Sequence, residues 1–375
     1  MDIQWMRQKI LSHEGLIFTL IFTLIFILTN LVMIDFKNMQ RLVSNMDPFT
    51  ILILAGIIAY LYKNSQVTFN KIKVLFLFVW GLYVISIFAS MLIADHFVWT
   101  EAIVWILLTL MFLYKIPMEL ILYMTTAALL SLPSLLLSDI TLNESGATLV
   151  LIYTAGLIFM PKTNKTMLFY VLPTFALLLL ITTSRTAIAV YLFVTVVQFA
   201  YINLYKTDRR QRKTFLITMG ALLMAPILIF FKPIYNFFIN DSINSKGIDL
   251  NELTSGRYGP WKTVYDNKQW LGEGHDYVDF TELLHVHNVL FDTLGRYGII
   301  TAVLFIVLLL MIFLISIVSI KTFNLALFVS AFLMIGIFEY SYLFMFVYFS
   351  PVILFFVITG FLINKNINPK DFRHT

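Results

Sequence analysis

Residues 15–34 read GLIFTLIFTLIFILTNLVMI, twenty consecutive residues without a charge. A helix of this length is roughly 30 Å long at 1.5 Å per residue, which matches the hydrocarbon core of a bilayer. Arg7 and Lys9 precede the run, and no A-x-A cleavage signal follows it. The segment therefore predicts an uncleaved first transmembrane helix with a cytoplasmic N-terminus.

The composition of the whole chain agrees with this first segment. Of the 375 residues, 60% are apolar and only 13% are charged, whereas a soluble domain carries about 25% charged residues. Soluble, fibrous and disordered classes are excluded. The chain has no Cys, which excludes disulfides, thiolate metal sites and a cysteine nucleophile.

Eleven further apolar runs follow the first, separated by charged or proline-containing breaks. They lie at about 48–62, 74–94, 97–114, 117–137, 147–160, 166–182, 186–205, 214–231, 299–320, 323–340 and 342–363. The runs at 48–62 and 147–160 are short for a bilayer crossing. The sequence predicts an all-α polytopic membrane protein with about twelve transmembrane helices and both termini cytoplasmic, in the cytoplasmic membrane.

The distribution of Lys and Arg is consistent with this topology. Seventeen of the 26 Lys and Arg fall in the loops expected to be cytoplasmic, five of them in the run at 206–213. This bias explains the net charge of +5 without a nucleic-acid partner. We divide the chain into N-terminal transmembrane helices (1–182), a second transmembrane region (183–363) that includes a large extracytoplasmic loop (232–284), and a cytoplasmic tail (364–375).

Two arginines on the expected outer side are candidates for binding an anion. Arg185 follows Ser184 at the outer end of an expected span, and Arg257 lies in the loop after a predicted turn or helix start at 254–256. A guanidinium binds phosphate oxygens bidentately. An arginine that snorkels to the headgroups is the alternative for Arg185. Trp261 and its aromatic neighbours can stack on sugars or form an interfacial belt.

Histidines precede the next span and are candidates for a base. His285, His287 and Asn288 lie there, and Arg296 follows on the same side. A neutral imidazole can accept a proton from a hydroxyl, and Asn288 can hold a ring or a substrate group. A metal site formed with residues 276, 279 and 282 is less favoured, because histidines two positions apart fit a strand better than a helix. Two cations and a base at one membrane face predict a site for a lipid-linked phosphate or diphosphate.

The order of these motifs is similar to a known family. Ser-Arg-Thr-Ala at 184–187, Ser-Gly-Arg at 255–257 followed by Trp261, Gly-Glu-Gly at 272–274, and His-Asn at 287–288 leading into Gly-Ile-Ile resemble the O-antigen ligase and O-antigen polymerase superfamily of bacterial envelope glycosyltransferases. The resemblance covers residues 183 to about 305. His285 is not part of the pattern, so the choice between His285 and His287 stays open.

The resemblance implies a GT-C-like, metal-independent glycosyltransferase without a cofactor, which uses undecaprenyl-diphosphate-linked oligosaccharide as donor. Arg185 and Arg257 would hold the diphosphate, and His287 would deprotonate the acceptor, with Asn288, His285, Ser184, Trp261 and Arg296 in support. Attack opposite the departing phosphate would invert the anomeric configuration.

Three functions fit these residues. The first is a repeat-unit polymerase for a capsule, exopolysaccharide or O-antigen, working beside a flippase and a chain-length regulator. The second is a ligase that moves the finished glycan to another acceptor. The third, of another class, is a lipid-linked oligosaccharide flippase or transporter, which would more often place charges along a path through the membrane.

Overall fold

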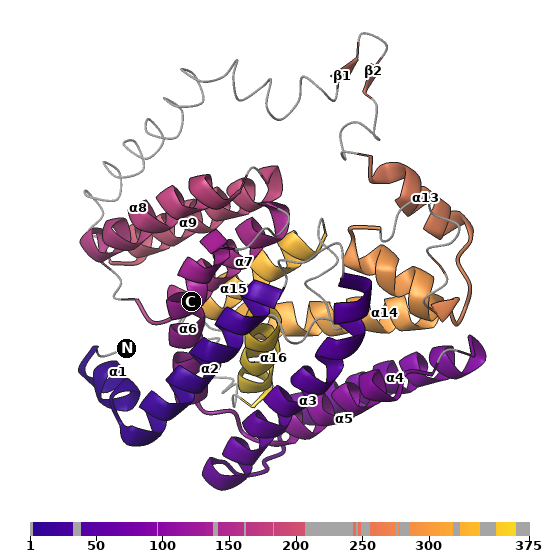
Figure 1. Ribbon diagram of the computed structural model, residues 1–375, viewed down its shortest axis with the longest axis horizontal. Coiled ribbons are helices and arrows are strands. Elements are labelled where there is room, and N and C mark those ends of the chain that lie inside the picture. The colour runs from indigo at the N-terminus through magenta and orange to yellow at the C-terminus, as the bar shows by residue number, and fades with distance from the viewer. Residues whose placement is uncertain are drawn as a thin grey trace.

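The computed structural model describes residues 3–32, 39–95, 97–137, 142–160, 163–182, 184–206, 243–244, 247–248, 256–274, 277, 286–317, 323–337 and 350–364. Within these ranges the regular structure is helical, apart from one pair of two-residue antiparallel strands and an isolated antiparallel bridge between Val67 and Tyr114 (Figure 1). This agrees with the all-α class expected from the apolar runs.

Where the structure describes the linking residues, short connections join the helices from α1 to α9. In chain order the elements are α1 (Ile3–Ile10), α2 (His13–Val32), α3 (Met39–Asn64), α4 (Lys71–Ile93), α5 (Trp99–Leu113), α6 (Met118–Ser131) with the 3₁₀ turn η2 (Leu132–Leu137), α7 (Leu142–Gly156), α8 (Asn164–Ile181), α9 (Arg185–Lys206), β1 (Ile243–Asn244), β2 (Gly247–Ile248), α13 (Tyr258–Asp266), α14 (Val289–Ile317), α15 (Phe323–Gly336) and α16 (Ser350–Ile363). Every expected span except 214–231 overlaps one of these helices, and 214–231 lies outside the described residues.

Among the residues that the structure describes, five helices are long and apolar enough to cross a membrane. They cover His13–Leu31, Lys71–Ile93, Met118–Leu136, Arg185–Asn203 and Val289–Ile317. Five shorter apolar helices accompany them: Thr50–Asn64, Trp99–Leu113, Thr166–Ile181, Phe323–Gly336 and Ser350–Ile363. These helices support a membrane-embedded helical protein, whereas the count of twelve crossings stays a prediction.

The outward helix faces are apolar, as expected of a surface in contact with lipid. On α4 the exposed residues Leu75, Phe78, Leu82 and Ile85 recur every three or four positions and form one stripe. The opposite face of α4 packs on α5 and α14. The central helix is α16, in which nearly all residues are buried among α5, α6, α7, α14 and α15.

Polar contacts join loops at two opposite ends of the molecule. At one end, which we call the lysine-rich end and define by Lys9, Lys63, Lys71, Lys73 and Lys115, the ammonium of Lys9 lies 3.1 Å from Glu119 and that of Lys63 lies 3.8 Å from Glu14. Lys73 donates to the Leu113 carbonyl at 2.6 Å and to Asn364 at 2.9 Å. All these loops are expected on one side of the membrane.

The other end, which we call the site end, is defined by Ser90, Asn288, Arg296 and Ile337. Ser90 near the C-terminus of α4 donates to the Arg296 carbonyl at 3.1 Å, and the Asn288 amide donates to the Ile337 carbonyl at 2.8 Å. Ser90 lies roughly 29 Å along α4 from Lys71, at 1.5 Å per residue. The two ends are therefore about one bilayer core apart.

Candidate functional site

The site end is organised by a break in α14. Gly298 has φ 84° and ψ −177°, so a short first arm (Val289–Tyr297) is separated from a long second arm that starts at Ile299. The second arm ends at Ile317 and is roughly 28 Å long, enough to cross a bilayer core. Its start agrees with the expected span at 299–320.

The loop segment 269–273 packs on this break. It forms hydrogen bonds with backbone groups that the break leaves without a partner in the helix. The Ile299 amide donates to the Gln269 carbonyl at 2.9 Å, and the Glu273 amide donates to the Gly295 carbonyl at 3.1 Å. A Cβ on Gly272 would lie 2.4 Å from the Arg296 oxygen, and one on Gly298 would lie 2.4 Å from the Gly272 nitrogen. The Gly-Glu-Gly motif thus provides close backbone packing at the break, which matters because an irregular backbone near lipid must be covered by protein.

Asn288 caps the first arm of α14. Its Oδ1 accepts from the amides of Leu290 (2.8 Å) and Phe291 (3.2 Å), while its Nδ2 donates to the Ile337 carbonyl just beyond α15. Both ends of this buried amide are therefore engaged in holding α14 against α15. The side chain positions its neighbour His287 and does not itself reach into an open site.

His287 precedes this cap in an uncommon backbone conformation. Its φ is +46°, in the left-handed region, and its side chain is half-buried. Non-glycine residues rarely adopt this conformation, which costs of order 1 kcal/mol and is enriched at functional sites. His287 is thus held in a left-handed conformation immediately before the residue that caps α14.

Helix α13 docks directly beside His287. The indole of Trp261 donates to the Val286 carbonyl at 2.6 Å and stacks on Phe291, with ring centroids 5.6 Å apart. Phe291 covers one face of the indole, so Trp261 joins α13 to α14. Arg257 is the N-cap residue of α13, one turn before Trp261. The arginine and the histidine of the predicted site therefore lie on segments that contact each other.

Arg296 is held in a buried cluster with Asp292 and Tyr277. Its Nε lies 3.1 Å from Asp292 Oδ1 in an ion pair that is about nine-tenths buried, and the Tyr277 hydroxyl donates to the same carboxylate. The guanidinium also lies over the Tyr277 ring, 5.5 Å from its centroid. Burial and the Asp292 carboxylate raise the pKa of Tyr277, which keeps the phenol protonated as a donor. This cluster fixes the first arm of α14 under α13.

Arg185 is the first residue of α9. Buried Ser184 precedes it as a cap, and its Oγ accepts from the Ala187 amide at 3.3 Å. The Ser184 amide in turn donates to Thr182 Oγ1 at 2.8 Å. Ser184 thus shapes the turn that presents Arg185, which is half-buried.

Helix packing brings Arg185 to the site end. Tyr201 near the end of α9 stacks on Phe323 at the start of α15, with ring centroids 3.9 Å apart, so the two helices run antiparallel. From this pair, Arg185 lies roughly 24 Å back along α9 and Ile337 roughly 21 Å forward along α15. The start of α9 and the end of α15, where Asn288 is bound, therefore lie toward the same end of the molecule.

Glu144 was not among the residues that the sequence pattern indicated, and it lies on α7 next to the segment that leads into Arg185. This carboxylate is buried in the first turn of α7, where Gly146 packs so closely on Thr182 that a Cβ would lie 2.6 Å from it. A single acid at the outer start of an apolar run is a signal that could have been used. Glu101 on α5 is another buried acid, and it accepts from the Tyr297 hydroxyl.

An apolar hollow lies beside the contact between Asn288 and Ile337. Its volume is about 300 Å³, and it is lined by both arms of α14, through Val289, Leu290, Ile306 and Leu310 among others, and by the end of α15 at Leu333 and Ile337. The two arms therefore fold toward each other across the break. The hollow extends from the start of α14, two residues after His287, to the middle of the second arm.

Other expected site residues fall outside the described part of the chain. These are His285 and the acids at 276, 279 and 282. Within the described residues, no three His, Cys, Asp or Glu side chains come together as a metal site.

Neither the models of known protein families nor the curated protein sequences include a match to this chain.

Proposed function

We propose that the protein is a membrane-embedded glycosyltransferase that moves a glycan from a lipid diphosphate to a hydroxyl acceptor at the site end. The proposal rests on the packing of α13, with Arg257 as its N-cap residue, against α14, which His287 closely precedes, and on the packing of α9, which starts at Arg185, against α15. Helix starts carry a partial positive charge, which adds to that of the two guanidinium groups in attracting an anion.

A lipid diphosphate fits this arrangement in both of its parts. The anionic diphosphate matches the two guanidinium groups and the partial positive charge of the helix starts. The lipid tail matches the apolar hollow between the arms of α14 and α15. The order of motifs that resembles the O-antigen ligase and polymerase superfamily adds support for undecaprenyl diphosphate as the carrier.

The proposed reaction is a single displacement at the anomeric carbon. The His287 imidazole accepts the proton of the acceptor hydroxyl, the acceptor oxygen bonds to the anomeric carbon, and the bond from that carbon to the diphosphate oxygen breaks. Arg185 and Arg257 stabilise the charge on the departing diphosphate. A positioned base typically accelerates such a step by about 10²–10⁴-fold. Stabilising the negative charge on the departing diphosphate lowers the barrier further.

Among transferases we propose a polymerase, in which the acceptor is another lipid-linked repeat unit. The test incubates the purified protein in lipid with an undecaprenyl-diphosphate oligosaccharide and resolves the products on a gel. We expect a ladder for the natural chain. His287→Asn tolerates the left-handed backbone but lacks the base, and Arg257→Lys keeps the charge but loses the two-pronged contact, so both should lose at least about 100-fold in rate.

The matched control is Lys262→Ala, which removes an exposed cation from the same helix, α13. It should leave the ladder intact. Donor consumption only after a second acceptor is added would replace the polymerase by a ligase. No consumption under any condition would reject the transferase and direct attention to transport of the same lipid.

A further inference from the structure

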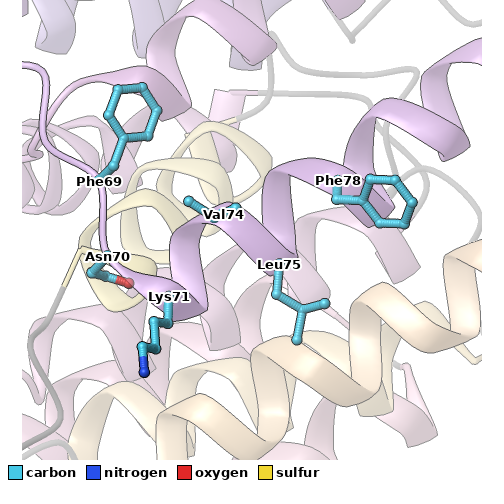
Figure 2. Close-up of a pocket in the computed structure, with 6 residues that line it drawn as sticks. All are labelled: Phe69, Asn70, Lys71, Val74, Leu75 and Phe78. Atoms are coloured by element: carbon cyan, nitrogen blue, oxygen red, sulfur yellow. The ribbon is translucent and has the colours of Figure 1, made fainter.

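A second hollow lies at the lysine-rich end, about one bilayer core from the candidate site. It has a volume of about 610 Å³ and is lined by Phe69, Asn70, Lys71, Val74, Leu75 and Phe78 (Figure 2). The volume falls in the range of about 300–1,000 Å³ that is typical of sites for small organic ligands. The hollow opens on the exposed, lipid-facing side of α4.

The lining is apolar except at one edge. Phe69, Val74, Leu75 and Phe78 are each more than half exposed, and they continue into the lipid-facing stripe of α4. Figure 2 shows Lys71 and Leu75 directed to the same side of the helix, with Phe69 and Phe78 at opposite ends of the hollow. An occupant must therefore combine an apolar body with an anionic or polar group at the Lys71 edge.

The other polar group at this edge is already engaged. Asn70 caps α4 by accepting from the Lys73 amide at 2.8 Å, and its Nδ2 donates to the Ile363 carbonyl at 3.0 Å. Lys73 itself is buried and donates to Leu113 and Asn364. Lys71 is the exposed cation of the lining, and it marks the level of the headgroups on this side.

We propose that this hollow binds one anionic diacyl phospholipid, with the headgroup phosphate at Lys71 and an acyl chain along Val74, Leu75 and Phe78. Charge complementarity at Lys71 selects an anionic lipid over a zwitterionic one, and the aromatic residues at both ends fix the acyl chain. The proposal is independent of the transferase reaction, because it uses no residue of the site end.

The test is native mass spectrometry of the full chain in detergent, supplied with equal amounts of phosphatidylglycerol and phosphatidylcholine. We expect one phosphatidylglycerol to be retained by the natural chain. Lys71→Ala should weaken retention about fivefold, since one basic residue near the surface contributes about that factor. Val74→Trp, at an exposed position, should reduce retention by filling the hollow while Lys71 remains.

Lys115→Ala is the matched control, because it removes another exposed cation of the lysine-rich end and should retain the lipid. Equal retention of both lipids by the natural chain would overturn the proposal, as would unchanged retention in Val74→Trp, which would indicate only general surface attraction. A dimer that forms in place of a lipid adduct would also overturn it, because a second copy would then cover the hollow.

Discussion

At the scale of single residues, the left-handed backbone conformation of His287 costs conformational free energy. His287 has a φ of +46°, a conformation that is strained for any residue except Gly. The expected explanation is function, because strain persists where surrounding contacts impose it and selection keeps the side chain.

Two substitutions that remove the imidazole of His287 test this strain. His287→Gly and His287→Ala both remove the imidazole, so both should lose transfer activity. Because only Gly relieves the left-handed conformation, His287→Gly should be more stable than His287→Ala by about 1 kcal/mol. Thermal unfolding in detergent measures the difference. Equal melting temperatures would show that the backbone at 287 is not strained.

The buried ion pair under α13 gives a second prediction. Arg296→Met leaves the Asp292 carboxylate buried without its guanidinium, which should destabilise the protein by about 3–5 kcal/mol. The double variant Asp292→Leu with Arg296→Met removes both charges and should recover part of that loss. The melting temperatures of the single and double variants measure this coupling. A double variant less stable than Arg296→Met would contradict the assignment.

The sequence indicated that Arg296 lies at the outer side but not what it contacts. Asp292 lies four residues away on the same helix, a spacing that favours a pair, so the ion pair was predictable. The contact of Tyr277 was not predictable, because its ring packs against Gly295, where a Cβ would lie 2.2 Å from that ring. Such a contact depends on the tertiary path of the loop.

At the scale of elements, apolar runs predicted the helices, because a bilayer forces uninterrupted backbone hydrogen bonding along each run. The fold-back of α14 was not predictable in the same way. The expected span began at 299, yet no proline marks the break, and the conformation of Gly298 depends on its contact with the backbone of residues 270–272. The first arm, which follows His287 and its neighbour Asn288, therefore depends on tertiary contacts.

The break predicts a large effect for a small substitution. Gly298→Ala places a Cβ within 2.6 Å of three backbone atoms at a φ of +84°, so either the loop undocks or the arm shifts. We expect a loss of several kcal/mol in stability, together with loss of transfer activity. Thermal unfolding and the glycan gel measure the two effects.

Gly81→Ala is the control for this prediction. Gly81 lies within α4, and a Cβ there meets no atom within 4 Å. Alanine should therefore stabilise the helix by about 0.5–1 kcal/mol. If Gly298→Ala behaved like Gly81→Ala, the backbone contact between Gly272 and Gly298 would not hold the break.

At the scale of the whole molecule, the distribution of Lys predicted which loops come together. Loops expected on one side are joined by the pairs of Lys9 with Glu119 and of Lys63 with Glu14, and by the contacts of Lys73. Asn288 and Ile337 join at the other end. Charge distribution constrains sidedness because each polar loop must stay in water, but it does not determine which helices are neighbours.

The absence of Cys from the chain allows a direct test of the two ends. Lys63→Cys and Lys115→Cys introduce thiols at the lysine-rich end, whereas Tyr258→Cys and Lys268→Cys introduce them on and just after α13, all at exposed positions. A membrane-impermeant maleimide should label the second pair in intact cells and the first pair only after permeabilisation, because the excess of Lys marks the cytoplasmic side. Labelling of all four thiols from one side would reject the two-ended architecture. The reversed pattern would keep the architecture but place the site end in the cytoplasm, where a glycan already moved to the outer face could not reach His287.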